Sequence, residues 1–91
     1  MRTVRLLPIL FELYGYKIFF WSNENGEPIH VHVAKGKQSA NATKIWLPQD
    51  SNPVVAHNKS RIPQKVLTRL LKAIALERSN IIASWYDYFK I

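Results

Sequence analysis

Short apolar blocks alternate with polar segments up to about residue 57, a pattern typical of β-strands and the loops between them. Residues 9–14 form the first apolar block, and Gly15 separates it from a second, strongly aromatic block over residues 16–21. A single glycine between two such blocks predicts a tight hairpin. Polar segments rich in Gly, Pro, Ser and Asn then delimit three further predicted strands, at residues 29–34, 40–47 and 54–57.

After Pro63 the apolar residues recur at intervals of three and four, which predicts an amphipathic helix. The polar residues 77–80 interrupt this pattern, so it fits one long bent helix or two consecutive helices. Ser60 precedes Pro63 by three residues and is a candidate for the helix cap, because proline is tolerated in a first helical turn. The apolar stripe consists of Leu67, Leu70, Leu71, Ile74, Ile81, Ile82, Trp85, Tyr88 and Phe89.

Together these patterns predict an α+β fold, in which a small antiparallel sheet of four to five strands packs against a C-terminal helical region. The 91 residues suffice for one small domain, which we place over 1–91, with strands at about 9–57 and helices at about 63–90. Hydrophobic residues make up 47% of the chain, which is enough for one modest core.

Two of the three histidines lie in the strand predicted at 29–34. Successive side chains of a strand point to opposite faces, so His30 and His32 share one face and the intervening apolar residues share the other. If the apolar face contacts the helix, the histidine face points away from it and is accessible to water. The next strand places Asn41 and Thr43, or in an alternative register Lys44 and Trp46, beside the histidines.

The histidine pair has three interpretations, because an imidazole is both an acid or base near neutral pH and a metal ligand. In the first, His30 and His32 are the acid and base of a ribonuclease-like site, with positive charge from nearby lysines such as Lys35. In the second, they form half of a metal site that Glu24, Glu27 or His57 completes. In the third, the pair is structural. The spacing does not choose among them, and the sequence predicts no cofactor.

Charge changes this picture, because 13 Lys and Arg against 6 Asp and Glu give a net charge of +7. A small domain this basic attracts polyanions, so nucleic acid or an acidic protein is the expected partner. Between Ser51 and Leu76 no residue is acidic, and the alternative there is a solvated helix face. The residues that we predict to bind nucleic acid are Lys35, Lys59, Arg61, Lys65, Arg69 and Lys72.

The chain contains no cysteine, so the fold uses no disulfide. Glu12 and Lys17 interrupt the N-terminal apolar residues, which are far fewer than the ~18 of a membrane span and are not followed by a signal-type cleavage site. We expect a soluble, cytoplasmic protein.

Two separate strings carry a family resemblance. Residues 16–24 read Y-x-I-F-F-W-S-N-E, and residues 27–33 read E-P-x-H-V-H-V. They are similar to the signature of a bacterial family of small uncharacterised proteins, the domain-of-unknown-function family 4160. Lys44–Leu47 and Trp85–Phe89 resemble a later strand and the helix end of that family, so the resemblance covers about residues 8–90. This chain differs in a longer hairpin over 35–43 and a more basic segment over 59–72.

The resemblance implies no established activity. Members of the family look like small stand-alone cytosolic proteins that are often encoded beside another short protein, an arrangement similar to toxin–antitoxin modules. This favours a toxin-like protein that acts on nucleic acid in a ribonuclease-like manner, with His30 and His32 as acid and base. A non-catalytic module that binds nucleic acid or protein, and a His-based metal-binding domain, stay open as alternatives.

Overall fold

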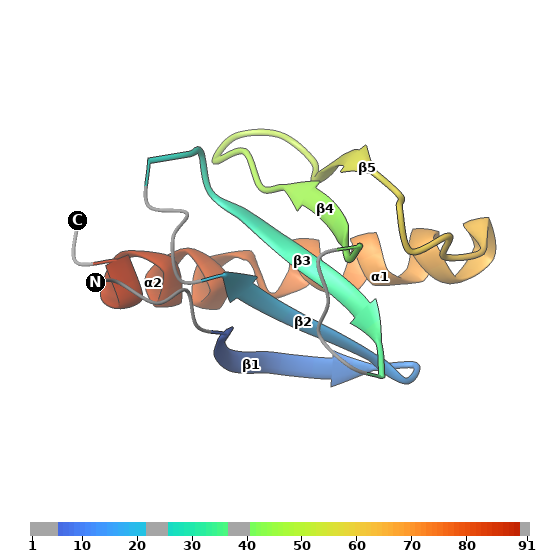
Figure 1. Cartoon of the computed structure of the whole chain (residues 1–91). Helices are drawn as coiled ribbons and strands as arrows, with labels where there is room; N and C mark the ends of the chain where they lie inside the picture. The colour runs from blue at the N-terminus through green and yellow to red at the C-terminus, as the bar shows by residue number, and fades with distance from the viewer. Residues whose placement is uncertain (1–5, 22–25, 37–40, 90–91) are drawn as a thin grey trace.

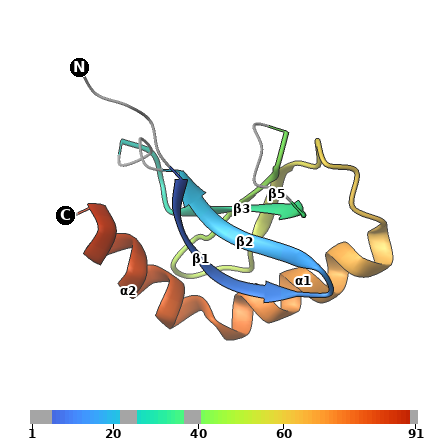
Figure 2. The same cartoon turned by 60° about the horizontal axis from the view of Figure 1, so that its bottom comes forward.

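The computed structural model describes residues 6–21, 26–36 and 41–89, and these ranges hold five strands and two helices. The strands pair in chain order as an antiparallel meander, and both helices cover the same face of the sheet (Figures 1 and 2). This arrangement confirms the predicted α+β fold, including the fifth strand. The elements are β1 (Leu6–Leu13), β2 (Tyr16–Trp21), β3 (His30–Lys35), β4 (Thr43–Trp46), β5 (Val54–His57), α1 (Gln64–Leu76) and α2 (Arg78–Phe89).

The register between β3 and β4 is the second of the two predicted alternatives. His30 pairs with Trp46, and His32 pairs with Lys44. On its other side His32 pairs with Phe19 of β2. Cross-strand partners point to the same face, so the histidine face carries two aromatic neighbours and one basic neighbour rather than Asn41 and Thr43.

Two consecutive helices form the C-terminal region, and Glu77 separates them. Backbone bonds from the N–H of Glu77 to the carbonyl of Ala73, and from the N–H of Ile81 to the carbonyl of Glu77, continue the helical pattern through the break. The helices therefore follow one another end to end as a bent run beneath the sheet (Figure 2). This bend allows both apolar stripes to reach the sheet.

The main core lies between the sheet and the helices. The sheet contributes Ile18 of β2 and Val31 and Val33 of β3. The burial of Val31 and Val33 against the helices was predicted from the alternation in the histidine strand. Leu70 and Trp85 are the corresponding buried residues of α1 and α2, and the Trp85 ring stands edge-on to that of Phe20, with 5.2 Å between ring centroids. A smaller cluster of Phe19, Ala34 and Ala42 is also buried.

A buried polar network connects the sheet to the loop before α1. Thr43 has no exposed area, and its hydroxyl donates to Oδ1 of Asn58 at 2.6 Å and lies 2.5 Å from Oγ of Ser60. The Asn58 side chain in turn bonds the N–H and the carbonyl of Ile62. Ser60 is thus not the helix cap that the sequence predicted: Pro63 occupies that position without a side-chain bond, and Ser60 contacts the sheet instead.

The packing of α1 predicts a large difference between two leucines of the same helix. Leu70→Ala removes a side chain with no exposed area and should lower the free energy of unfolding by about 2–5 kcal/mol. Leu76→Ala is the matched control, because the Leu76 side chain is 86% exposed and its loss should cost less than about 0.5 kcal/mol. Urea unfolding followed by tryptophan fluorescence measures both, and similar losses would contradict this placement of α1.

Candidate functional site

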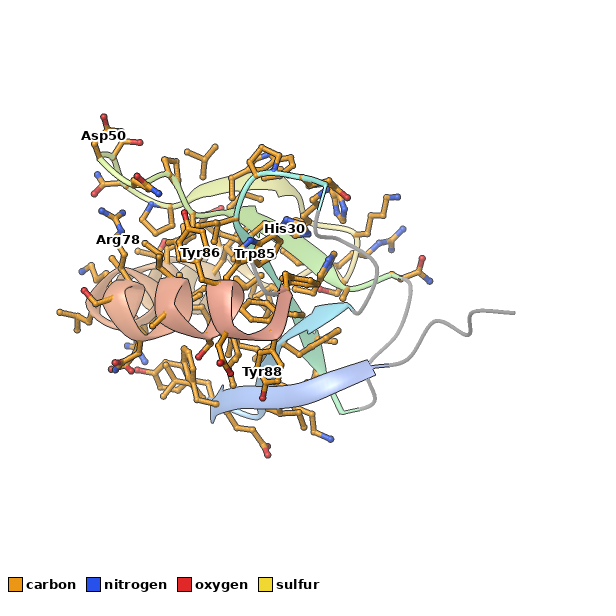
Figure 3. The ribbon with its side chains drawn as sticks, turned by 90° about the vertical axis from the view of Figure 1, so that its left-hand side faces the viewer. His30, Asp50, Arg78, Trp85, Tyr86 and Tyr88 are labelled. Atoms are coloured by element: carbon orange, nitrogen blue, oxygen red, sulfur yellow. The ribbon has the colours of Figure 1, made fainter. Side chains whose placement is uncertain are left out.

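His30 is enclosed by aromatic rings. Its ring centroid lies 5.2 Å from those of Trp46 and Trp85 and 5.1 Å from that of His32. Figure 3 shows His30 and Trp85 lying close together between the sheet and α2. Nδ1 of His30 lies 2.8 Å from the carbonyl oxygen of Pro28, which can only accept, so Nδ1 is the donor.

The prediction that His30 faces away from the helix is wrong. His30 is the first residue of β3 and pairs with Trp46, the last residue of β4, so it lies at the end of the sheet. At that end α2 runs past the sheet, and Trp85 reaches the imidazole. Strand alternation predicts the face of the sheet to which a side chain points. It does not predict which helix residues contact that side chain at the end of the sheet.

The prediction that the histidine face is accessible to water is also wrong. His30 has no exposed area and His32 is 8% exposed. The His32 ring lies against Phe19, with 5.8 Å between centroids, and Phe19 is itself fully buried. Both histidines therefore belong to the packed interior rather than to an open cleft.

His32, Lys44 and His57 form a row across β3, β4 and β5, which we call the polar row. Lys44 of β4 pairs with His32 on one side and with His57 on the other. Between Lys44 and the next residue of β4, the register with β5 shifts by one residue. Burial, and then electrostatic repulsion from Lys59, His32 and Lys44, hold the pKa of His57 below its ordinary value of 6.5. His57 is therefore neutral at pH 7. The backbone N–H of Lys59 donates to its Nδ1 at 3.4 Å.

Lys44 also has an acidic and an aromatic partner. Its ammonium lies 2.7 Å from Oε1 of Glu27 and 4.3 Å from the centroid of the Trp46 ring. The Lys44 side chain is 18% exposed and that of Glu27 is 43% exposed, so the pair lies at the rim of the histidine region. Glu27 thus compensates the charge of Lys44.

The predicted metal ligands do not converge in the described residues. Within residues 6–21, 26–36 and 41–89, no group of three or more His, Cys, Asp or Glu side chains is placed to hold a metal ion. Glu27 pairs with Lys44, and Nδ1 of His30 faces a carbonyl. Glu24 lies outside the described residues.

The predicted nucleic-acid-binding residues are all exposed. Five of them follow one another along the chain from the loop before α1 into the helix, and we call these the basic band. Lys65, Arg69 and Lys72 lie on the side of α1 away from the buried Leu67, Leu70 and Ile74. In the described part of the chain none of the five forms an ion pair. The members of the basic band are Lys59, Arg61, Lys65, Arg69 and Lys72.

Sequence reasoning missed two features of this surface. The first is the pairing of His57 with Lys44: the sequence named His57 only as one possible partner of the histidine pair, and the one-residue shift in register on β5 cannot be read from alternation. The second is Tyr14, which is exposed in the β1–β2 turn and lies beside the basic band, with 5.9 Å between its ring centroid and Cζ of Arg69. The sequence held a signal for this feature, because an aromatic residue directly precedes Gly15, the glycine of the predicted hairpin.

The fold and these surfaces define a small α+β protein with a buried histidine pair and an exposed basic helix. The chain belongs to the family of the domain of unknown function DUF4160, whose family model matches residues 15–86. The match extends from the β1–β2 turn into α2 and confirms the family resemblance seen in the sequence. No curated protein and no solved structure matches the chain. Neither described helix has the length and apolar character needed to cross a membrane.

The lowered pKa of His57 predicts a stability that falls in acid. In the unfolded chain the pKa of His57 returns to its ordinary value of 6.5, so below that pH the unfolded chain takes up a proton that the folded protein resists. The free energy of unfolding should therefore decrease as the pH falls through this value, and no such loss occurs above it.

His57→Gln removes this titration while keeping a polar side chain of similar size. Urea unfolding of the parent and of His57→Gln at pH 7.5, 6.0 and 5.0 should show the variant gaining stability relative to the parent as the pH falls. Parallel pH profiles would show that the folded protein does not resist protonation of His57.

Proposed function

We propose that this protein binds nucleic acid through the basic band and that it acts by binding rather than by catalysis. The observation that carries the proposal is the accessibility of the band: all five cationic side chains are exposed, and in the described part of the chain none is ion-paired. Side chains that must contact a phosphate backbone need this accessibility.

The arrangement of charge on α1 supports a polyanionic partner. Lys65 and Arg69 are four residues apart and Lys72 follows three residues later, so their like charges repel along one helix face. A phosphate backbone laid along this face would relieve the repulsion and release its own counterions. The net charge of +7 would also accelerate the encounter with such a partner.

The burial of the histidine pair argues against the ribonuclease-like alternative. Cleavage through a 2′-hydroxyl requires an acid and a base within hydrogen-bonding reach of the substrate. His30 has no exposed area, and His32 has 8%. The rings around His30 make it part of the packing of α2 on the sheet, so we favour a binding function over catalysis.

A basic nucleic-acid-binding protein of this size would suit the toxin-like component of a two-gene module. Its partner would then be a short acidic protein that covers the basic band and competes with nucleic acid. Both components would act in the cytoplasm, where their nucleic-acid target lies. This part of the proposal is supported by the charge of the chain and by the family resemblance.

The proposal predicts strong salt dependence that arises from the band and not from net charge alone. Lys65→Gln/Lys72→Gln should weaken binding to a fluorescein-labelled 20-nucleotide RNA. It should make the plot of log affinity against log salt shallower by about 0.7–0.9 for each lost phosphate contact. Fluorescence anisotropy over a range of salt concentrations measures both effects.

The matched control is Ser79→Glu/Ala83→Glu, which lowers the net charge by the same two units at exposed positions of α2. It should change the slope little. Equal effects of the two double variants, or binding that does not depend on salt, would contradict the proposed surface. Tighter binding to polyglutamate than to RNA would identify an acidic protein as the partner instead.

The preference for binding over catalysis has its own test. The parent protein, incubated with a fluorogenic RNA substrate at concentrations that saturate binding, should release no more product than a buffer control. RNA cleavage that His32→Ala abolishes, with the melting temperature of the variant within a few degrees of the parent, would establish the ribonuclease-like function instead.

A further inference from the structure

The turn between β1 and β2 has an unusual residue in its first position. Leu13 pairs with Tyr16, so Tyr14 and Gly15 alone make the turn. Their φ angles are 55° and 81°, as a two-residue turn of type I′ requires. This turn favours Asn, Asp or Gly at its first position, because a larger side chain is disfavoured at positive φ. A tyrosine here is not explained by the turn itself.

The core does not explain the tyrosine either. The Tyr14 side chain is 53% exposed, and it is not among the apolar side chains that pack on the main core. Its neighbour in the turn region, Tyr16, is by contrast 8% exposed and belongs to that core. Tyr14 thus presents an aromatic ring to solvent at a position where a small polar residue would serve the fold better.

One cationic side chain contacts the exposed ring, and a second lies beside the same turn. Cζ of Arg69 lies 5.9 Å from the ring centroid of Tyr14, within the range of a cation–π contact. Lys35 also lies beside the turn: its Nζ is 5.8 Å from the ring centroid of Tyr16, and its Cε would be 3.9 Å from a Cβ on Gly15. Figure 2 shows the β1–β2 turn close to α1, which carries Arg69.

We propose that Tyr14 is a stacking platform for an unpaired base, and that the nucleic acid bound by the basic band is single-stranded. This inference rests on the proposed function and specifies its target. An exposed aromatic ring can stack on any base that is free of a partner strand, while neighbouring cations hold the phosphates on either side. Bases in a duplex are already stacked and offer no free face to such a ring.

Arg69 connects the platform to the band. Its guanidinium contacts the Tyr14 ring from an exposed position on α1, between Lys65 and Lys72 in the sequence. A strand whose phosphates follow α1 would therefore pass the Tyr14 ring where the ring meets Arg69, between Lys65 and Lys72. The exposed Lys35 adds a further positive charge beside the turn.

The experiment compares three fluorescein-labelled probes of equal length: a single-stranded RNA, a single strand of abasic sites with the same number of phosphates, and an RNA duplex. Tyr14→Asn removes the ring and installs a residue that the turn prefers, so the fold is not endangered. Its melting temperature should equal or exceed that of the parent. Tyr14→Phe keeps the ring and is the matched control.

Tyr14→Asn should weaken binding to single-stranded RNA roughly 5- to 150-fold, the range expected for one lost stacking contact. Its salt dependence, and its binding to the abasic strand and the duplex, should match those of the parent. Tyr14→Phe should bind all three probes as the parent does. These results together would support the stacking platform.

Each of three outcomes would overturn the inference, and the first two are distinguishable from the third. If Tyr14→Asn binds single-stranded RNA as tightly as the parent while Lys65→Gln/Lys72→Gln still weakens binding, Tyr14 is not a platform but the band remains. The same conclusion follows if the parent prefers the duplex. If the parent binds none of the probes, the proposed function and this inference both fail.

Discussion

The packing of the helical stripe on one face of the sheet determines where the rest of the molecule lies. Leu67, Leu70 and Ile74 of α1, followed by Ile81 and Trp85 of α2, share one core with the strands. Once these side chains are buried, the rotation of α1 about its own axis is set, and its remaining side must face water. The exposure of Lys65, Arg69 and Lys72 is a consequence of that packing.

The same packing accounts for the burial of His30. Trp85 contributes to the core and also contacts the ring of His30, so the imidazole is enclosed by the docking of α2. The surrounding rings and the hydrogen bond to the carbonyl of Pro28 hold the His30 ring in place, and the enclosure leaves it no exposed area. The two histidines, which the sequence analysis took as the candidate catalytic pair, are therefore buried, and the cationic side chains of α1 are exposed.

A buried polar network fixes the path of the loop that leads from the sheet into α1. Thr43 is fully buried and faces the loop that joins β5 to α1, and its hydroxyl meets Asn58 and Ser60 there. Burial of a hydroxyl costs free energy unless a partner is present, so this network specifies one path for the loop. That path leads into α1 and so orients the basic band as well.

The pattern of apolar residues by itself determined the class of fold, because the change from strand-like blocks to three- and four-residue spacing marks the sheet and the helices. It also determined which residues of α1 are exposed, since one amphipathic face must be buried. It did not determine the surroundings of His30, His32 and His57, because these depend on a register, on a one-residue shift beside Lys44 and on where α2 passes the end of the sheet. Such contacts join residues distant in sequence, and only the tertiary structure decides them.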